Sequence, residues 1–138
     1  MSATARPGMF SQAVIILIAI VQFALGIVFV FFPHSFPDLL GLAPPPAWTD
    51  WIFAQFGARS FGFAYGMWLV LRDTHRHAGW MKAMIGVQVV DWVGTILALT
   101  AGKVSLAQVT TAPFLPLLFV IVLAMELRPR ADATKLMT

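Results

Sequence analysis

Residues 55–66 read QFGARSFGFAYG, and residues 84–95 read MIGVQVVDWVGT. Each stretch places one charged residue, Arg59 or Asp91, inside a run of mostly apolar residues that is long enough to cross a bilayer. A charge at the centre of a bilayer costs about 2.5 kcal/mol or more, so it rarely persists without a partner. The two charges together therefore predict a bundle of helices with a polar interior.

The composition of the whole chain indicates a membrane protein. Of its 138 residues, 59% are hydrophobic and 11% are charged, whereas soluble proteins contain about 25% charged residues. A soluble domain of this length could not bury so much apolar surface, and the length leaves room for one domain. The chain has no cysteine, which excludes thiol chemistry and with it the four-helix quinone-linked thiol oxidases.

Four apolar stretches reach the length of about 20 residues that a transmembrane helix needs. We predict spans at about 10–32, 48–71, 79–100 and 106–127. Prolines follow the first stretch, and proline cannot continue a helix; the polar loop 72–77 and the pair Gly102-Lys103 separate the others. The predicted fold is all-α, an antiparallel four-helix bundle in the membrane, with residues 1–138 as one domain.

The basic residues predict the orientation of this bundle. With four spans, nearly all of them fall on one side, which the positive-inside rule places in the cytoplasm. They are Arg6, Arg72, Arg76, Lys82, Arg128, Arg130 and Lys135, while Lys103 lies on the other side. We therefore expect both termini in the cytoplasm of a bacterial inner membrane. The net charge of +3 has the same origin, so we expect the lipid bilayer as partner and no nucleic acid.

Helical periodicity gathers the polar residues of the second and third predicted spans on one face of each helix. These faces comprise Gln55, Arg59, Gly62 and Gly66 on one span, and Met84, Gln88, Asp91, Thr95 and Ala98 on the other. Such a face should point inward, because lipid cannot satisfy its hydrogen bonds.

Arg59 and Asp91 are expected at the same depth in the bilayer. Each lies 12 residues from the expected cytoplasmic end of its span, at Leu71 or Gly79, which is about 18 Å along a helix. Antiparallel neighbours joined by a short loop would permit an ion pair between them. Gln22 of the first span falls at a similar level.

The fourth predicted span offers backbone acceptors in place of polar side chains. Pro113 and Pro116 would leave the carbonyls of Val109 and Ala112 without helical partners, and a guanidinium such as that of Arg59 has five donors. The candidate interior layer for a ligand is Gln22, Gln55, Arg59, Gln88, Asp91 and Thr95. No catalytic residue or metal site is identified, since the three histidines all fall at span ends or in loops.

Two further stretches, PHSFPDLLGL at 33–42 and FGARSFG at 56–62, carry a family resemblance. Together with the proline after the first span, they resemble the small bacterial four-helix membrane proteins called DoxX-like and DUF4345-like. The resemblance covers most of the chain and implies a buried arginine near the start of the second span, which Arg59 matches. For some DoxX relatives it also implies a role in quinone-linked respiratory or redox-stress assemblies.

Three functions fit these observations. In the first, the interior layer binds a lipid, a quinone or a similar amphiphile. In the second, the chain is an accessory subunit of a larger membrane complex or a homo-oligomer, and the small residues Ala58, Gly62 and Gly66 let a neighbouring helix approach. In the third, Asp91 carries protons for a transporter, which requires it to part from Arg59 during the cycle.

The charge pair and residues 35–42 each have an alternative, purely structural interpretation. The charge pair could simply fix the register of the helices, as buried ion pairs can do. Residues 35–42 are predicted to form a short amphipathic turn on the outer surface, which either caps the mouth of the bundle or only connects two spans.

Overall fold

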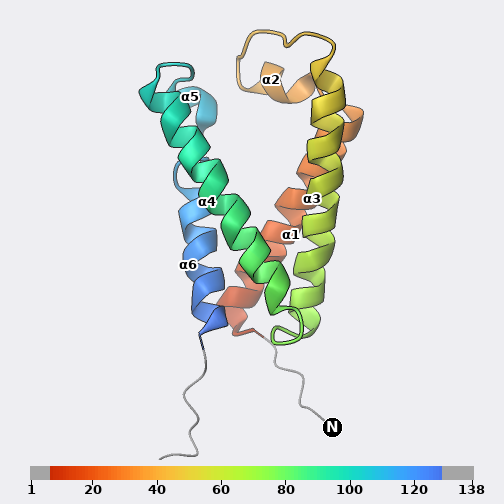
Figure 1. Cartoon of the computed structure of the whole chain (residues 1–138), viewed down its shortest axis with the longest axis vertical. Helices are drawn as coiled ribbons and strands as arrows, with labels where there is room; N and C mark the ends of the chain where they lie inside the picture. The colour runs from red at the N-terminus through yellow and green to blue at the C-terminus, as the bar shows by residue number, and fades with distance from the viewer. Residues whose placement is uncertain (1–6, 129–138) are drawn as a thin grey trace, which may run out of the picture.

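The structure, a computed structural model, describes residues 7–128, and every regular element in that range is a helix (Figure 1). The helices are α1 (Met9–Phe31), α2 (Ser35–Leu39), α3 (Thr49–Arg72), α4 (Ala78–Thr100), α5 (Leu106–Val109) and α6 (Leu115–Leu127). The all-α prediction is confirmed.

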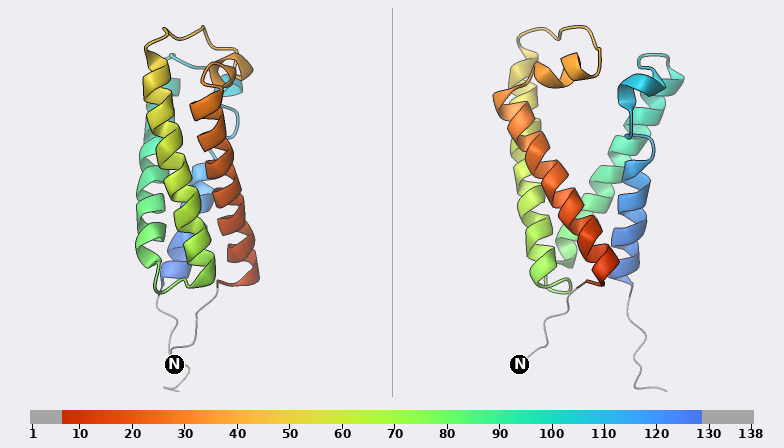
Figure 2. Two further views of the ribbon diagram at one scale, coloured as in Figure 1. Left: turned by 90° about the vertical axis from the view of Figure 1, so that its right-hand side faces the viewer. Right: turned by 180° about the vertical axis from the view of Figure 1, so that it is seen from behind.

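The four long helices run alternately up and down, so both ends of the described chain lie at the same end of the molecule (Figures 1 and 2). Helix α1 packs along α3, and α4 packs along α6. The two pairs meet at the end that carries the α3–α4 loop, here called the closed end. They diverge towards α2 and α5, at the open end, so the long helices form a V (Figure 1).

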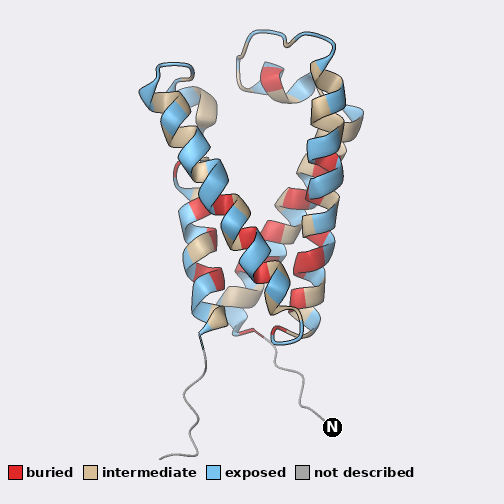
Figure 3. Cartoon of the chain, viewed as in Figure 1, coloured by how far each residue is buried: buried red, intermediate tan, exposed pale blue. Residues whose placement is uncertain are grey.

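The hydrophobic core lies towards the closed end and takes residues from all four long helices (Figure 3). Its members are Val14, Ile15 and Ile18 of α1, Met67 and Val70 of α3, Met81 and Met84 of α4, and Phe119, Val122 and Leu123 of α6. Burial of these side chains joins the two helix pairs at this end, so the space between the pairs opens only above the core.

Helices α1 and α3 approach each other closely at a pair of glycines, Gly26 and Gly57. A Cβ atom on Gly57 would lie 2.9 Å from the carbonyl oxygen of Gly26 and 2.6 Å from Cγ2 of Val30. The predicted close-packing row is divided, because a Cβ on Gly62 would meet nothing within 4 Å, whereas Gly66 packs against the ring of Trp80. The expectation that Gly62 points into the bundle is therefore wrong.

The stretch 106–127, predicted as one continuous span, is divided into α5 and α6. Helix α5 begins at a capping box between Ser105 and Gln108 and ends at Thr110, whose φ of 50° is not helical. Pro113 falls in the break, and Pro116 lies in the first turn of α6, where a missing N–H does no harm. The 13 residues of α6 extend about 20 Å.

Two helices of the described chain, α1 and α4, are long and apolar enough to cross a membrane by length and composition. Helix α3 is as long, with 24 residues, but carries charges and glycines among its apolar residues. Of the basic residues that predict orientation, Arg72 and Lys82 belong to the helix ends at the closed end, and Lys103 lies at the open end. Arg6, Arg130 and Lys135 lie outside the described residues.

Candidate functional site

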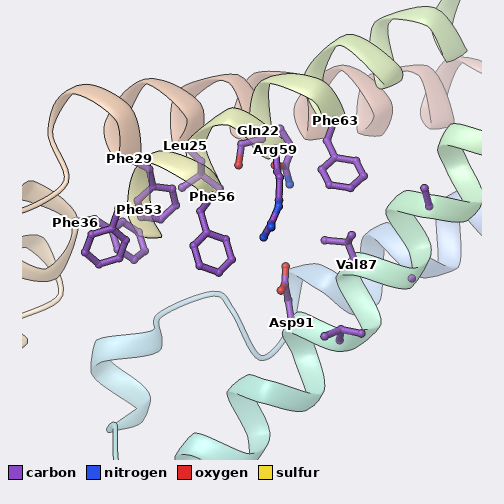
Figure 4. Close-up of a pocket in the computed structure, with 14 residues that line it drawn as sticks. Gln22, Leu25, Phe29, Phe36, Phe53, Phe56, Arg59, Phe63, Val87 and Asp91 are labelled. Atoms are coloured by element: carbon purple, nitrogen blue, oxygen red, sulfur yellow. The ribbon is translucent and has the colours of Figure 1, made fainter. Parts of the chain in front are cut away.

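A cavity of about 690 Å³ lies between the α1–α3 pair and α4, above the core (Figure 4). Helices α1, α2 and α3 supply one wall, and Ala83, Gly86, Val87, Val90 and Asp91 of α4 supply the facing wall. The small residues of α4 keep this wall thin, which leaves room for a ligand opposite the bulky side chains of α3.

Four polar residues form a belt at the middle of the cavity, here called the polar belt: Gln22, Arg59, Ser60 and Asp91. The side chains of Arg59 and Asp91 enter the cavity from opposite walls and point towards each other (Figure 4). Between residues 7 and 128, the basic and acidic side chains that lie within 4.0 Å of each other are those of His34 and Asp50, so no direct ion pair links Arg59 to Asp91. The charges therefore face the cavity without neutralising each other by contact.

The nearest contacts of Arg59 and Asp91 lie within their own helices, and one of them involves a charged group. The guanidinium carbon of Arg59 lies 5.8 Å from the centroid of the Phe56 ring, a distance at which a cation is attracted to the ring face. The main-chain carbonyl of Asp91 accepts a hydrogen bond of 2.8 Å from the Thr95 hydroxyl. The Asp91 carboxylate takes part in no ion pair of the described residues and lines the cavity.

Phenylalanines surround the polar belt and form an aromatic wall: Phe29, Phe36, Phe53, Phe56 and Phe63. Phe29 links three elements, because its ring packs edge-on against Phe36 at 5.0 Å and stacks on Phe53 at 5.6 Å. Phe36, Phe53 and Phe29 lie on the α2 side of the belt, and Phe63 lies on the other side (Figure 4). The cavity is therefore polar at its middle and apolar at both ends.

Helix α2 closes part of the open end. Its Phe36 lines the cavity, and Nε2 of the preceding His34 lies 3.1 Å from Oδ1 of Asp50 in α3. On the other side, Nε2 of Gln108 in α5 donates to the carbonyl of Gly41 at 3.3 Å. These contacts favour the cap over the plain connector as the interpretation of residues 35–42.

The six residues predicted for the interior layer divide into two groups. Gln22, Arg59 and Asp91 line the cavity together, as expected. The others do not line it. Gln55 is exposed, as Arg59 and Asp91 are, but outside the cavity. The Gln88 amide is buried and donates to Sδ of Met84 at 3.4 Å, and the Thr95 hydroxyl bonds within α4. The physical reason is that helical periodicity predicts which residues share one face of a helix. Because the two helix pairs form a V, only part of each such face borders the cavity.

Three features were not predicted from the sequence: Ser60, the aromatic wall and a hydrogen bond between α4 and the break before α6. Nε1 of Trp92 donates to the carbonyl of Pro113 at 2.9 Å. The carbonyl of Val109, expected to await a donor, accepts from the Ala112 amide at 3.0 Å. A tryptophan far from both ends of a span was the available signal, because tryptophans favour the interfaces and a buried indole N–H needs an acceptor.

The chain matches no protein-family model, no curated protein and no solved structure. The resemblance to DoxX-like proteins therefore stays a prediction.

Proposed function

We propose that the chain is a multi-pass protein of the bacterial inner membrane, in which the four long helices form an antiparallel bundle. Exposed apolar surface supports this assignment. In the most apolar window of α4 only 11% of residues are buried, and in that of α1 28%, whereas the core helix of a soluble protein would be mostly buried. Leu97 of α4 and Ile121 of α6 are 63% and 57% exposed, and lipid would cover such surface.

The charges agree with a closed end in the cytoplasm and an open end in the periplasm. The basic helix ends lie at the closed end, as the positive-inside rule requires. A green fluorescent protein fused after Thr138 should fluoresce, and alkaline phosphatase inserted at Pro45 should be active. Phosphatase activity after Thr138 would reverse the orientation, and activity at neither position would remove the membrane assignment.

We further propose that the cavity binds one amphiphilic small molecule, a lipid, a quinone or a similar compound. The observation that carries this proposal is the unpaired approach of Arg59 and Asp91 across a space bounded by aromatic rings. Charges at membrane depth are costly without partners. A head group placed between the two residues would accept hydrogen bonds from Arg59 and donate to Asp91, while its tail packs on the aromatic wall.

The charge balance of the polar belt narrows the class of head group. One cation and one anion face the cavity, so the site favours a head group without net charge. A hydroxyl both donates and accepts hydrogen bonds, and it could therefore serve both residues at once. A volume of about 690 Å³ falls within the range of about 300–1,000 Å³ that is usual for small-molecule sites.

Co-purification tests this proposal. The protein is purified in a mild detergent and extracted with organic solvent, and the extract is analysed by mass spectrometry. We expect one amphiphile at close to one molecule per chain, lost in Arg59→Met and retained in Lys103→Met, which removes a charge at the open end. An extract that contains no amphiphile, or the same amount from both variants, would contradict the proposal.

A second proposal is an accessory or self-associating role, favoured by the exposed small residues Ala58 and Gly62 on α3. Small residues let helices approach closely in lipid. Crosslinking of Ala58→Cys in membranes would give a dimer band if this face meets a second copy, and a strictly monomeric band would count against self-association.

A further inference from the structure

A second concavity, of about 470 Å³, lies on the outer face of the α1–α3 pair, away from the polar belt. Its floor includes Ala19 and Ala64, and its sides are formed by Ile20, Phe23, Phe61, Tyr65 and Trp68. The residues that form the sides of the groove are accessible from outside the protein, since Ile20, Phe23 and Trp68 are 61%, 54% and 42% exposed. The groove is lined without any charged residue.

The aromatic side chains along this groove form two ring–ring contacts. Phe23 packs edge-on against Phe61, with ring centroids 5.5 Å apart, and Tyr65 stacks on Trp68, with centroids 5.7 Å apart and planes inclined by 30°. Phe61, Tyr65 and Trp68 follow one another at helical spacing and are here called the aromatic ladder. They form a continuous apolar track along α3 towards the closed end.

The aromatic ladder ends at a cation. The guanidinium carbon of Arg72 lies 3.8 Å from the centroid of the Trp68 ring, so the ring holds the charge beside the end of the groove. Among residues 7–128 the one basic and acidic pair within 4.0 Å is that of His34 and Asp50, so no carboxylate of this range lies within that distance of the Arg72 guanidinium. A guanidinium is well suited to bidentate contact with phosphate.

The length of this track matches one leaflet of a bilayer. From Phe61 to Arg72 the helix advances by 11 residues, which is about 16 Å. Half of a hydrocarbon core of about 30 Å is about 15 Å. A lipid of the leaflet at the closed end could therefore lay an acyl chain along the ladder and place its phosphate at Arg72.

We propose that this groove binds an anionic phospholipid of the cytoplasmic leaflet, with one acyl chain on the aromatic ladder and the head group on Arg72. Charge complementarity selects an anionic head group over a zwitterionic one, because the charged group in contact with the end of the groove is the guanidinium of Arg72. The proposal rests on the membrane assignment above and is independent of the cavity at the polar belt.

Quenching of tryptophan fluorescence by brominated lipids tests this proposal directly, because Trp68 is part of the groove. The full chain is reconstituted into vesicles of phosphatidylcholine and phosphatidylglycerol, with either lipid brominated on its acyl chains. The chain has five tryptophans, so the signal of Trp68 is taken as the difference between the unaltered protein and Trp68→Phe. We expect about a fivefold preference of the Trp68 site for phosphatidylglycerol, the size of effect expected from one arginine near an anionic surface.

Matched variants separate a built site from the general surface potential. Arg72→Gln should reduce the preference to about one, and Arg72→Lys should keep part of it. Arg76→Gln removes the same charge from the adjacent loop and should leave the preference unchanged. Equal losses in Arg72→Gln and Arg76→Gln, or no preference in the unaltered protein, would overturn the proposal.

Two other outcomes would also overturn it and can be told apart. If only Trp68 escapes quenching by both lipids, a second copy or another protein covers the groove, and a disulfide between copies of Tyr65→Cys would identify the second copy. If no tryptophan is quenched, the chain is not embedded in the vesicle, and the membrane assignment itself fails.

Discussion

The indole Nε1 of Trp92 on α4 donates a hydrogen bond of 2.9 Å to the carbonyl oxygen of Pro113, in the break between α5 and α6. The next residue back from Trp92 is Asp91, whose side chain enters the cavity. This hydrogen bond gives the Pro113 carbonyl a donor. It also links the irregular segment between α5 and α6 to α4, the helix that carries Asp91. Irregular backbone is tolerated at membrane depth when protein groups satisfy it.

Replacement of Trp92 by phenylalanine should therefore destabilise the protein. The change leaves the Pro113 carbonyl without its donor, which costs about 1–3 kcal/mol when the group stays away from water. The melting temperature in detergent should fall in Trp92→Phe. The control is Trp51→Phe, because Trp51 is 67% exposed, and its melting temperature should barely change. Equal shifts in both variants would show that the hydrogen bond contributes nothing.

The close approach of α1 and α3 predicts opposite effects for two glycine substitutions on one helix. Gly57→Ala would push a methyl group to 2.9 Å from the carbonyl oxygen of Gly26, and such overpacking costs about 1–3 kcal/mol. Gly62→Ala meets nothing within 4 Å and should stabilise α3 by up to about 1 kcal/mol, because alanine is the better helix former. Thermal melting of the two variants side by side checks this, and a loss of stability in Gly62→Ala would be inconsistent with its open environment.

The charges at the polar belt should matter more for binding than for stability. Arg59→Met and Asp91→Asn each remove a charge that has no ion-pair partner in the protein, so neither should lower the free energy of unfolding by more than about 1 kcal/mol, and the two changes should add within about 0.5 kcal/mol. Binding of the amphiphile should nevertheless be lost in both. Losses of about 3–5 kcal/mol in each single variant, with recovery in the double variant, would instead reveal a structural ion pair.

Most of the helices could be predicted from the sequence because strong local signals mark their ends. Prolines follow α1, and the polar loop at 72–77 separates α3 from α4. The division of the stretch 106–127 was not predicted, although Pro113 and Pro116 were recognised as freeing carbonyl groups. A continuous apolar run conceals such a break, since hydropathy measures composition and says nothing about a non-helical φ such as that of Thr110.

The candidate site could be predicted only in part, for a similar reason. Depth along the helix predicted Gln22, Arg59 and Asp91 at one level, because the rise per residue is constant, and all three line the same cavity. The direction in which each side chain points depends on how α4 diverges from the α1–α3 pair, and this depends on packing at the closed end. Gln88 was therefore assigned to the layer, whereas its amide is buried against Met84.

The central claim, that an amphiphile occupies the cavity at the polar belt, can be tested with two glycines of α4. Gly86 lines the cavity and Gly94 does not, yet a Cβ added to either would meet nothing within 4 Å. Gly86→Leu and Gly94→Leu should both fold, since leucine is the better helix former. The measurement is photolabelling by a long-chain alcohol that carries a diazirine, followed by peptide mass spectrometry. We expect labels at 53–63 and 83–91 in the unaltered protein and in Gly94→Leu, and loss of these labels in Gly86→Leu. Equal labelling of these peptides in both variants would contradict the account.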